Sequence, residues 1–398
     1  MGFLIEELAD AQKKALIFEI ARKKSGDSDK DWSELTEEFD LDVSPETLRK
    51  AGVGVKLAEA AGMLRSMDEA EEASQGVIDR MKLRELSAKV NEMYRKEARV
   101  ELLAESVKEA AKGLKPMQPL AYREIPRESD KALVLCIGDV HYGAKIHVKG
   151  LNGETINRFD GEVFEARMQR LLQETIAILK KENIATVHVF LVGDLIDGML
   201  RQSQLIRLEY GLVESTMRFS EYMANWILSL SMYADVHVAA CSGNHSEVRP
   251  LGSKRREFEA ENMEKIILWY MAARLDEMRD EGIDIDVSCE RFNKKEVLGH
   301  TFLLLHGDAE KDISKFADES IRLYGEPIDF FVCGHKHREN EYPTGMTQQG
   351  TSAIVRVPSL CGVDTYANSK NFGGAPGALA MVMEMDYGRR CIYPIRLA

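Results

Sequence analysis

The sequence lacks the features of a membrane-bound, secreted or disulfide-bonded protein. No apolar run approaches the roughly 18 residues that a membrane-spanning helix needs. The N-terminus, MGFLIEELADAQKK, has no basic segment before an apolar core, and Glu6 stands where myristoylated chains favour Ser or Thr. The six cysteines include no C-x-x-C pair, which argues against a disulfide scaffold or a cysteine zinc site. We therefore expect a cytoplasmic protein without a membrane partner.

An excess of basic charge is also absent. The net charge of the 398 residues is −13, which argues against a protein that coats nucleic acid nonspecifically. Local basic patches or bound cations would have to carry any interaction with a polyanion. A hydrophobic content of 44% with 30% charged residues is ordinary for a globular protein, and the length predicts two or three domains.

The residue pattern changes at three prolines within residues 113–130, GLKPMQPLAYREIPRESD. The chain before this segment has no strand-like runs, whereas the chain after it alternates strand-like and helical patterns. We therefore place the main domain boundary there. The predicted regions are an all-α, helix-turn-helix-like domain (1–70), a long helix or coiled coil (71–115), a linker (116–130) and an α/β domain (131–398).

Two short helices are predicted within DWSELTEEFDLDVSPETLRKAG, after an amphipathic helix over residues 3–24. Ser44 can cap the second short helix, and Pro45 suits its first position. This spacing is typical of a helix-turn-helix whose small core is apolar: Trp32, Leu35, Phe39, Leu41, Val43 and Leu48. The segment either reads DNA or is a helical hairpin with the same caps, and the sequence leaves both open.

Residues 78–112 have the pattern of one long helix with an apolar heptad repeat. One row is Leu83, Val90, Glu97 and Ala104, and the other is Leu86, Met93, Val100 and Val107. Glu97 and Ala104 weaken the first row. The repeat predicts a long helical hairpin or a coiled coil, and the coiled coil would make a homodimer. The alternative is an amphipathic helix packed on its own domain.

Five apolar runs in the second half each end in polar residues of catalytic type. They lead to GDVH (138–141), GDLIDG (193–198), GNHSE (243–247), HGD (306–308) and GHKH (334–337). Helical stretches between most of them predict an α/β sheet covered by helices, whose ligands collect at the carboxyl ends of the strands. At the last of these ends, alternation along extended backbone would send His335 and His337 the same way.

These strand ends supply seven candidate metal ligands: Asp139, His141, Asp194, Asn244, His306, His335 and His337. Taken singly, each has a plain structural role, such as a helix N-cap or a turn. Five clusters in order at one sheet edge argue against chance. Imidazoles, carboxylates and one amide are too rich in nitrogen for calcium or magnesium alone and suit Mn²⁺, Fe or Zn²⁺. Seven ligands exceed what one ion can use, which favours two ions that share a bridging carboxylate.

This motif series resembles that of the calcineurin-like metallophosphoesterases. The resemblance covers residues 132 to about 340 and implies a four-layer α/β/β/α sandwich with a site for two divalent ions. It implies one ion at Asp139, His141 and His337, a second at Asn244, His306 and His335, and a bridging Asp194. Mn²⁺ is the expected metal, with Fe and Zn²⁺ as alternatives. Two ions about 3.5–4 Å apart would activate a bridging hydroxide for in-line attack on phosphorus.

His245 is adjacent to a candidate ligand but outside the ligand set, so we expect it to protonate or stabilise the leaving oxygen. The resemblance implies that Asp197 pairs with this imidazole, raises its pKa and fixes its tautomer. Family members usually have Asp or Glu directly after the corresponding histidine. Here Ser246 comes first and Glu247 follows, a departure that touches none of the seven candidate ligands.

The metal ligands do not select among phosphoester substrates. The residues around the metal site must therefore determine which phosphoester is bound. Arg249, Arg255 and Arg338 are candidate substrate contacts, and the alternative is a solvated basic surface. The helical leader and the motif order resemble the DNA repair exonuclease branch and phage- or prophage-encoded chains. This implies a DNA nuclease, acting in the host cytoplasm if the chain is phage-encoded, and leaves an ATPase partner open. The rivals are a small-molecule phosphodiesterase or phosphatase, and a DNA-binding or scaffolding protein with a vestigial metal site.

Three more strands are predicted in the tail from about residue 341: GTSAIVRVPSL, ALAMVMEM and RRCIYPIRL. We assign all three to a second sheet. The polar, glycine-rich loop between the first two, CGVDTYANSKNFGGAPG, is either a lid or an ordinary surface loop.

Overall fold

The chain forms two compact units, Met1–Arg99 and Val100–Ala398. The computed structural model describes residues 10–60, 81, 83–85, 87, 117, 122–126, 129–198, 208–248, 257–309, 313–347, 350–369 and 373–398. The predicted long helix over 78–112 lies outside the described residues except at 81, 83–85 and 87, which are helical. The coiled coil and its homodimer therefore stay predictions. Among the described helices, none combines the length and the apolar character that crossing a bilayer requires.

Over its described residues 10–60, the first unit forms three helices: α1 (Asp10–Ser25), α2 (Trp32–Glu38) and α3 (Pro45–Ala60). The hydroxyl of Ser44 accepts the backbone N–H of Thr47 at 3.2 Å, so a side-chain cap starts α3. The buried core of the unit is Leu16, Ile20, Ala21, Leu35 and Leu48, with Trp32, Phe39, Leu41 and Val43 packed against it. The α2–α3 pair and its apolar core thus lie where the sequence places them. A DNA-reading role for the pair stays a prediction.

The described part of the second unit contains two large sheets and a separate hairpin. Its strands are β1 (Lys131–Ile137), β2 (Ile146–Lys149), β3 (Thr155–Phe159), β4 (Thr186–Leu191), β5 (Asp235–Ala240), β6 (Ile283–Ile285), β7 (Phe292–Val297), β8 (His300–Leu305), β9 (Phe330–Cys333), β10 (Asn340–Thr347), β11 (Gly350–Arg356), β12 (Gly377–Glu384) and β13 (Gly388–Arg396). Its helices are α5 (Gly161–Glu182), α7 (Leu212–Ser231), α8 (Met263–Arg274), η2 (Asp276–Glu281), α9 (Ile313–Tyr324) and α10 (Thr365–Ser369).

Each large sheet has a parallel centre. The first sheet has the order β13-β12-β1-β4-β5-β6, in which β1, β4, β5 and β6 run parallel and β12 and β13 run antiparallel to their neighbours. The second has the order β10-β11-β9-β8-β7, with β8, β9 and β11 parallel and an antiparallel strand at each edge. Strands β2 and β3 pair only with each other. The carboxyl ends of the parallel strands therefore share one edge in each sheet.

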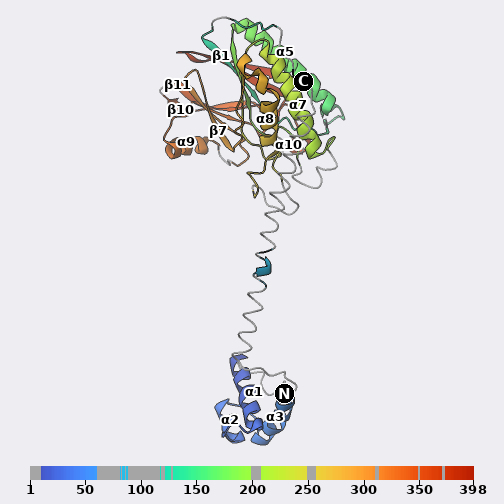
Figure 1. The fold of residues 1–398 in the computed structure, drawn as a ribbon, viewed down its shortest axis with the longest axis vertical. Coiled ribbons are helices and arrows are strands. Elements are labelled where there is room, and N and C mark those ends of the chain that lie inside the picture. Colours follow the sequence, from blue (N-terminus) through green and yellow to red (C-terminus); the bar gives the residue numbers. More distant parts are fainter. Residues whose placement is uncertain are drawn as a thin grey trace. The chain divides into compact units, whose positions relative to one another are not determined.

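The two sheets pack face to face. Successive residues on β1 point to opposite faces of the first sheet, so this strand contributes side chains to two cores. Leu133 and Leu135 enter one core with side chains of α5, α7 and α8. Val134 enters another core with Phe302 of β8 and Phe330 of β9, between the sheets. A third core joins the outer face of the second sheet to α9. Figure 1 shows α9 on the side away from α5 and α7, and the predicted mixed α/β fold is confirmed.

The assignment of all three tail strands to the second sheet is wrong. Only β11 joins that sheet, beside β9, whereas β12 pairs with β1 in the first sheet and β13 pairs with β12. Both faces of β12 are buried, with Ala380 in the helix-side core and Met381 in the core between the sheets. A strand buried on both faces reads as a continuous apolar run, which does not reveal the sheet to which it belongs.

Candidate metal centre

The seven candidate ligands stand at the carboxyl ends of five strands. Asp139 and His141 follow β1, Asp194 follows β4, Asn244 follows β5, His306 follows β8, and His335 and His337 follow β9. Three of these strands belong to the first sheet and two to the second. The site therefore lies where the ends of both sheets meet, and each sheet supplies part of it.

Five of the seven residues have left-handed backbone conformations. The φ angles are 48° at Asp139, 48° at His141, 53° at Asp194, 67° at His335 and 51° at His337. Such angles are uncommon outside glycine and cluster at functional sites, where the surrounding fold holds them. They also correct the expectation for the last motif, because His335 and His337 lie in a bend and not on extended backbone.

Glycines let the strand ends approach each other closely. A Cβ atom added at Gly193 would lie 2.8 Å from the Cα of Gly243, and one at Gly243 would lie 2.0 Å from the backbone nitrogen of Asp194. Neither position tolerates a side chain without movement of the backbone. The glycine that precedes the acid in GDLIDG and the one that precedes the amide in GNHSE thus place Asp194 beside the end of β5.

One group of candidate ligands surrounds Asp194. Its Oδ2 lies 2.9 Å from Nε2 of His306, and that nitrogen lies 3.3 Å from Nδ1 of His335. The other ring nitrogen of His306 lies 2.9 Å from the carbonyl oxygen of Val192, to which an Nδ1–H would donate. This carbonyl orients the ring and leaves Nε2 to face the acid, as in histidines that bind metals. Asn244 and His306 line one small hollow in the same region.

A second group surrounds His141 and His337. Their Nε2 atoms lie 3.3 Å apart, and Oδ1 of Asp139 lies 3.4 Å from Nε2 of His337. The Nδ1 of His337 lies 3.1 Å from the carbonyl oxygen of Gly362, which orients this ring in turn. Asp194 lies between the groups, since its Oδ2 is 3.9 Å from Nε2 of His141. The sequence-predicted ligands are thus brought together, and His335 and His337 face different partners.

The buried acids and imidazoles of the cluster shift one another's pKa values. Burial alone would raise the pKa of Asp194, but the positive charge of His306 outweighs it and holds the pKa well below its usual value. Burial alone would lower the pKa of His306, but Asp194 raises it to about 10. Burial and the neighbouring His306 lower the pKa of His335 to about 3. A divalent cation would compete with the imidazole protons for these carboxylates.

The residues fit a divalent metal. Oδ1 of Asp139 is buried and accepts no hydrogen bond from a described residue, although a buried carboxylate oxygen without a donor is costly. The described residues contain three groups of potential ligand atoms within 4.8 Å of one another: His141–His337–Cys361, His141–Asp194–His245 and Asp194–His306–His335. Nitrogen and carboxylate donors at this density can bind Mn²⁺, Fe or Zn²⁺. Cys361 is a member that the sequence did not suggest.

His245 and Asp197 form a pair beside these groups. The Nδ1 of His245 lies 2.6 Å from Oδ1 of Asp197, and the backbone N–H of His245 donates to Asp194 at 2.7 Å. Burial opposes the charged imidazole, but Asp194 and Asp197 outweigh it, so the pKa of His245 is raised. The His245 side chain keeps 18% of its surface exposed, against 1% for His306. A partly exposed imidazole next to the cluster, whose raised pKa favours the protonated form, can donate a proton to a substrate.

Glu264 is a functional candidate that the sequence did not reveal. It is fully buried in the first turn of α8, where it accepts the backbone N–H of Leu195 at 2.8 Å and that of Gly243 at 2.6 Å. The hydroxyl of Ser246 also donates to it, at 2.8 Å. One carboxylate thus ties together the loops that carry Asp194 and Asn244. No local motif marks it, because its partners stand up to 69 positions away.

Arg167 supports the other side of the cluster. This buried guanidinium on α5 donates to the carbonyl oxygens of Leu360 at 3.0 Å and Cys361 at 2.8 Å, and to the side chain of Asn157 at 2.9 Å. Its two backbone partners lie in the loop whose next carbonyl, that of Gly362, orients His337. The sequence offers no signal for it, since an arginine in an amphipathic helix is ordinarily a surface residue.

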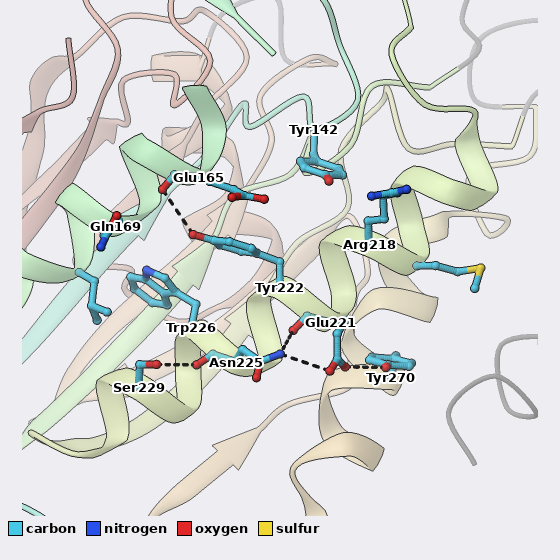
Figure 2. A pocket seen from close by; sticks show the side chains of 12 residues that line it. Tyr142, Glu165, Gln169, Arg218, Glu221, Tyr222, Asn225, Trp226, Ser229 and Tyr270 are labelled. Carbon is cyan, nitrogen blue, oxygen red and sulfur yellow. Dashed lines mark hydrogen bonds between the residues drawn. The ribbon is translucent and has the colours of Figure 1, made fainter. Parts of the chain in front are cut away.

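The predicted substrate contacts are only partly described. Arg249 and Arg255 lie outside the described residues, whereas Arg338 is exposed directly after His337. A separate cavity has a volume of about 800 Å³. Side chains of α5, α7 and α8 and the ring of Tyr142 line it (Figure 2). Among the described residues that line it, none is a candidate ligand. The Tyr142 ring packs against Phe164 and so points to this helical side of the sheet.

Comparison with known proteins finds a matching family and a similar curated protein. The family pattern described as calcineurin-like phosphoesterase matches residues 132–339. A curated relative, the SPbeta prophage-derived uncharacterized protein YonJ of Bacillus subtilis (strain 168), is 28% identical over 315 residues, which are 78% of this chain and 76% of YonJ.

Solved structures that match this chain have low sequence identity to it. An archaeal phosphodiesterase is 11% identical, with a TM-score of 0.33, and the match covers 66% of this chain and 99% of that chain. Zinc-bound Vps29 from Entamoeba histolytica is 12% identical, with a TM-score of 0.29, and the match covers 67% and 99%.

Proposed function

Because the chain belongs to the calcineurin-like phosphoesterase family, we propose that it is a metal-dependent nuclease that hydrolyses phosphodiester bonds of DNA. The observation that carries the proposal is the convergence of seven nitrogen and oxygen donors from five strand ends. Water attacks phosphorus in line with the leaving oxygen, and the chain positions the phosphate and supplies the proton for that oxygen.

Two divalent ions would be held by the two groups of ligands. Asp139, His141 and His337 would hold one, Asn244, His306 and His335 would hold the other, and Asp194 would serve both. The position of Asp194, 2.9 Å from His306 and 3.9 Å from His141, supports the bridging role. When bound, such ions neutralise phosphate charge and lower the pKa of water. Mn²⁺ is our preferred metal because the donors mix carboxylate, amide and imidazole, and Fe and Zn²⁺ are the alternatives.

His245 acts as the general acid in this proposal. Its Nδ1–H donates to Asp197, which fixes the tautomer and leaves Nε2 to face the substrate. The raised pKa of His245 keeps the imidazole protonated to higher pH, as protonation of a leaving alkoxide requires. Asp197 is the residue that orients it.

DNA is the proposed substrate because of what accompanies the phosphoesterase unit. The helices α2 and α3 form a pair with an apolar core of its own, an arrangement that supports a helix-turn-helix role and that a phosphatase of metabolites does not need. The similarity to a prophage-derived chain also favours a role with nucleic acid. Arg249, Arg255 and Arg338 are proposed to contact backbone phosphates, and the heptad segment over 78–112 is proposed to form a dimer in the host cytoplasm.

The test is cleavage of end-labelled single- and double-stranded DNA with Mn²⁺ present. Wild-type protein should degrade DNA, and Asp194→Ala and His245→Ala should abolish or strongly slow cleavage. Asp284→Ala, which removes an exposed acid on β6, is the matched control and should cleave normally. Intact DNA beside rapid hydrolysis of bis(p-nitrophenyl) phosphate would replace the nuclease by a small-molecule phosphodiesterase.

A further inference from the structure

The hairpin formed by β2 and β3 has one buried and one exposed face. Ile146 and Val148 of β2 and Phe159 of β3 belong to the helix-side core. The alternate residues of β2 and its preceding position, Lys145, His147 and Lys149, are exposed, and so are the cross-strand Ile156 and Arg158 of β3. The register places Arg158 opposite His147. We call these five exposed residues the ribbon face.

The ribbon face is basic in a chain whose net charge is −13. Neither Lys145 nor Lys149 forms an ion pair with a described residue, so both charges face solvent. Arg158 pairs with Asp160 at 2.8 Å, but its side chain keeps 63% of its surface exposed. A local positive strip in an acidic protein is complementary in charge to a polyanion.

The hairpin is attached to the candidate metal centre. It begins directly after the GDVH motif, four residues beyond His141 at Lys145. Its Asn157 donates from Nδ2 to the carbonyl oxygens of Cys361 and Val363, both at 2.8 Å. The carbonyl between them, that of Gly362, is the one that orients His337. Asn157 lies on the buried face, so its contacts fix the hairpin beside the loop that orients His337, and the ribbon face is the opposite, exposed face. That face begins at Lys145, close in the chain to the candidate ligand His141.

We propose that the ribbon face binds the sugar-phosphate backbone of the nucleic acid strand whose scissile phosphate occupies the metal centre. The inference rests on the proposed nuclease function and deepens it by assigning a substrate path. Lysines neutralise phosphates, and two-stranded β-ribbons are elements that nucleic acids accommodate. The exposed Ile156, with 52% of its surface accessible, and the fully exposed Leu151 at the hairpin tip offer apolar contact to sugars or bases.

The experiment compares Lys145→Ala/Lys149→Ala with the wild type in the full-length, Mn²⁺-loaded protein. The matched control, Lys315→Ala/Arg322→Ala, removes two exposed charges from α9, which packs on the other sheet. Two readouts are measured: kcat/KM for DNA over a series of salt concentrations, and kcat/KM for bis(p-nitrophenyl) phosphate. The small substrate reports whether the metal centre and the fold are intact.

At low salt, the ribbon variant should lose on the order of tenfold in kcat/KM for DNA, and its log–log salt slope should become shallower by roughly 1.8 for a duplex. Its activity on the small substrate and the control variant's activity on DNA should match the wild type. If the ribbon variant cleaves DNA as the wild type does, the inference is overturned but the proposed nuclease function is not. An acidic protein is then the better partner for this face. Hydrolysis of only the small substrate by the wild type overturns both proposals.

Discussion

The carboxylate of Glu264 accepts the backbone N–H of Gly243 at 2.6 Å and so fixes the residue that precedes Asn244. The same carboxylate holds Leu195, which follows Asp194. Two candidate ligands on different strands are thus positioned by one buried acid on a helix. Burial, with help from the negative Asp194, raises the pKa of Glu264 to about 7.

Glu264→Gln should weaken metal binding. The amide nitrogen of glutamine cannot accept a hydrogen bond, so one of the two backbone N–H groups loses its partner and the ligand loops shift. Changes to groups that orient metal ligands cost roughly 10–100-fold in affinity. Titration calorimetry with Mn²⁺ measures the effect, and Glu290→Gln, an exposed acid that pairs with Lys265, is the control. An unchanged Mn²⁺ affinity would remove Glu264 from the machinery of the site.

His245→Ala should slow reactions in proportion to the basicity of the leaving group. A general acid contributes about 10²–10⁴-fold when the leaving oxygen is a strong base, and little when it is a nitrophenolate. We expect a large loss on DNA and a loss of less than about tenfold on bis(p-nitrophenyl) phosphate. Asp197→Asn should show the same trend with smaller losses. Equal losses on both substrates would argue that His245 holds the site together and does not transfer a proton.

Arg167→Met should destabilise the second unit. The guanidinium makes hydrogen bonds to the carbonyls of Leu360 and Cys361 and to Asn157, and methionine leaves the Leu360 carbonyl and the Asn157 side-chain oxygen without this donor. We expect a loss of about 3 kcal/mol in the free energy of unfolding. Urea denaturation followed by tryptophan fluorescence measures it. Arg170→Met is the control, because Arg170 lies on the same helix and is exposed. Equal unfolding midpoints for the two variants would contradict the assigned role.

His188 should make the second unit less stable in acid. Burial, together with the charge of the stacked His237, lowers the pKa of His188 to about 4. Between the pKa values of the unfolded and the folded chain, the unfolded chain binds a proton at His188 and the folded chain does not. The free energy of unfolding therefore falls as pH decreases from about 6.5 to about 4. The loss amounts to roughly 3 kcal/mol when the shift is complete. His188→Gln should flatten the dependence of the unfolding midpoint on pH in this window, and a slope equal to that of the wild type would refute the assignment.

The strand-end motifs could be predicted because their signals are local. An apolar run followed by Gly-Asp or Gly-His places a ligand at a strand end without knowledge of the other strands. Glu264 and Arg167 could not be found this way, since each is an ordinary helix residue until distant loops fold against it. The sheet of β12 was assigned wrongly because burial on both faces gives no alternation. Left-handed φ angles at Asp139 and His337 were also invisible, since non-glycine residues rarely adopt them.

The division of the ligands between two sheets has a consequence for the order of events during synthesis. His141 and His337, whose imidazole nitrogens lie 3.3 Å apart, are separated by 196 positions in the chain. A nascent chain that ends before β9 contains only the ligands of the first sheet and His306. The chain between His141 and His337 must close into a loop before the centre is complete. A metal ion therefore meets the complete ligand set only late in the folding of this unit. Its capture marks the docking of the second sheet on the first, and a polypeptide halted during translation would be incapable of cutting phosphoesters.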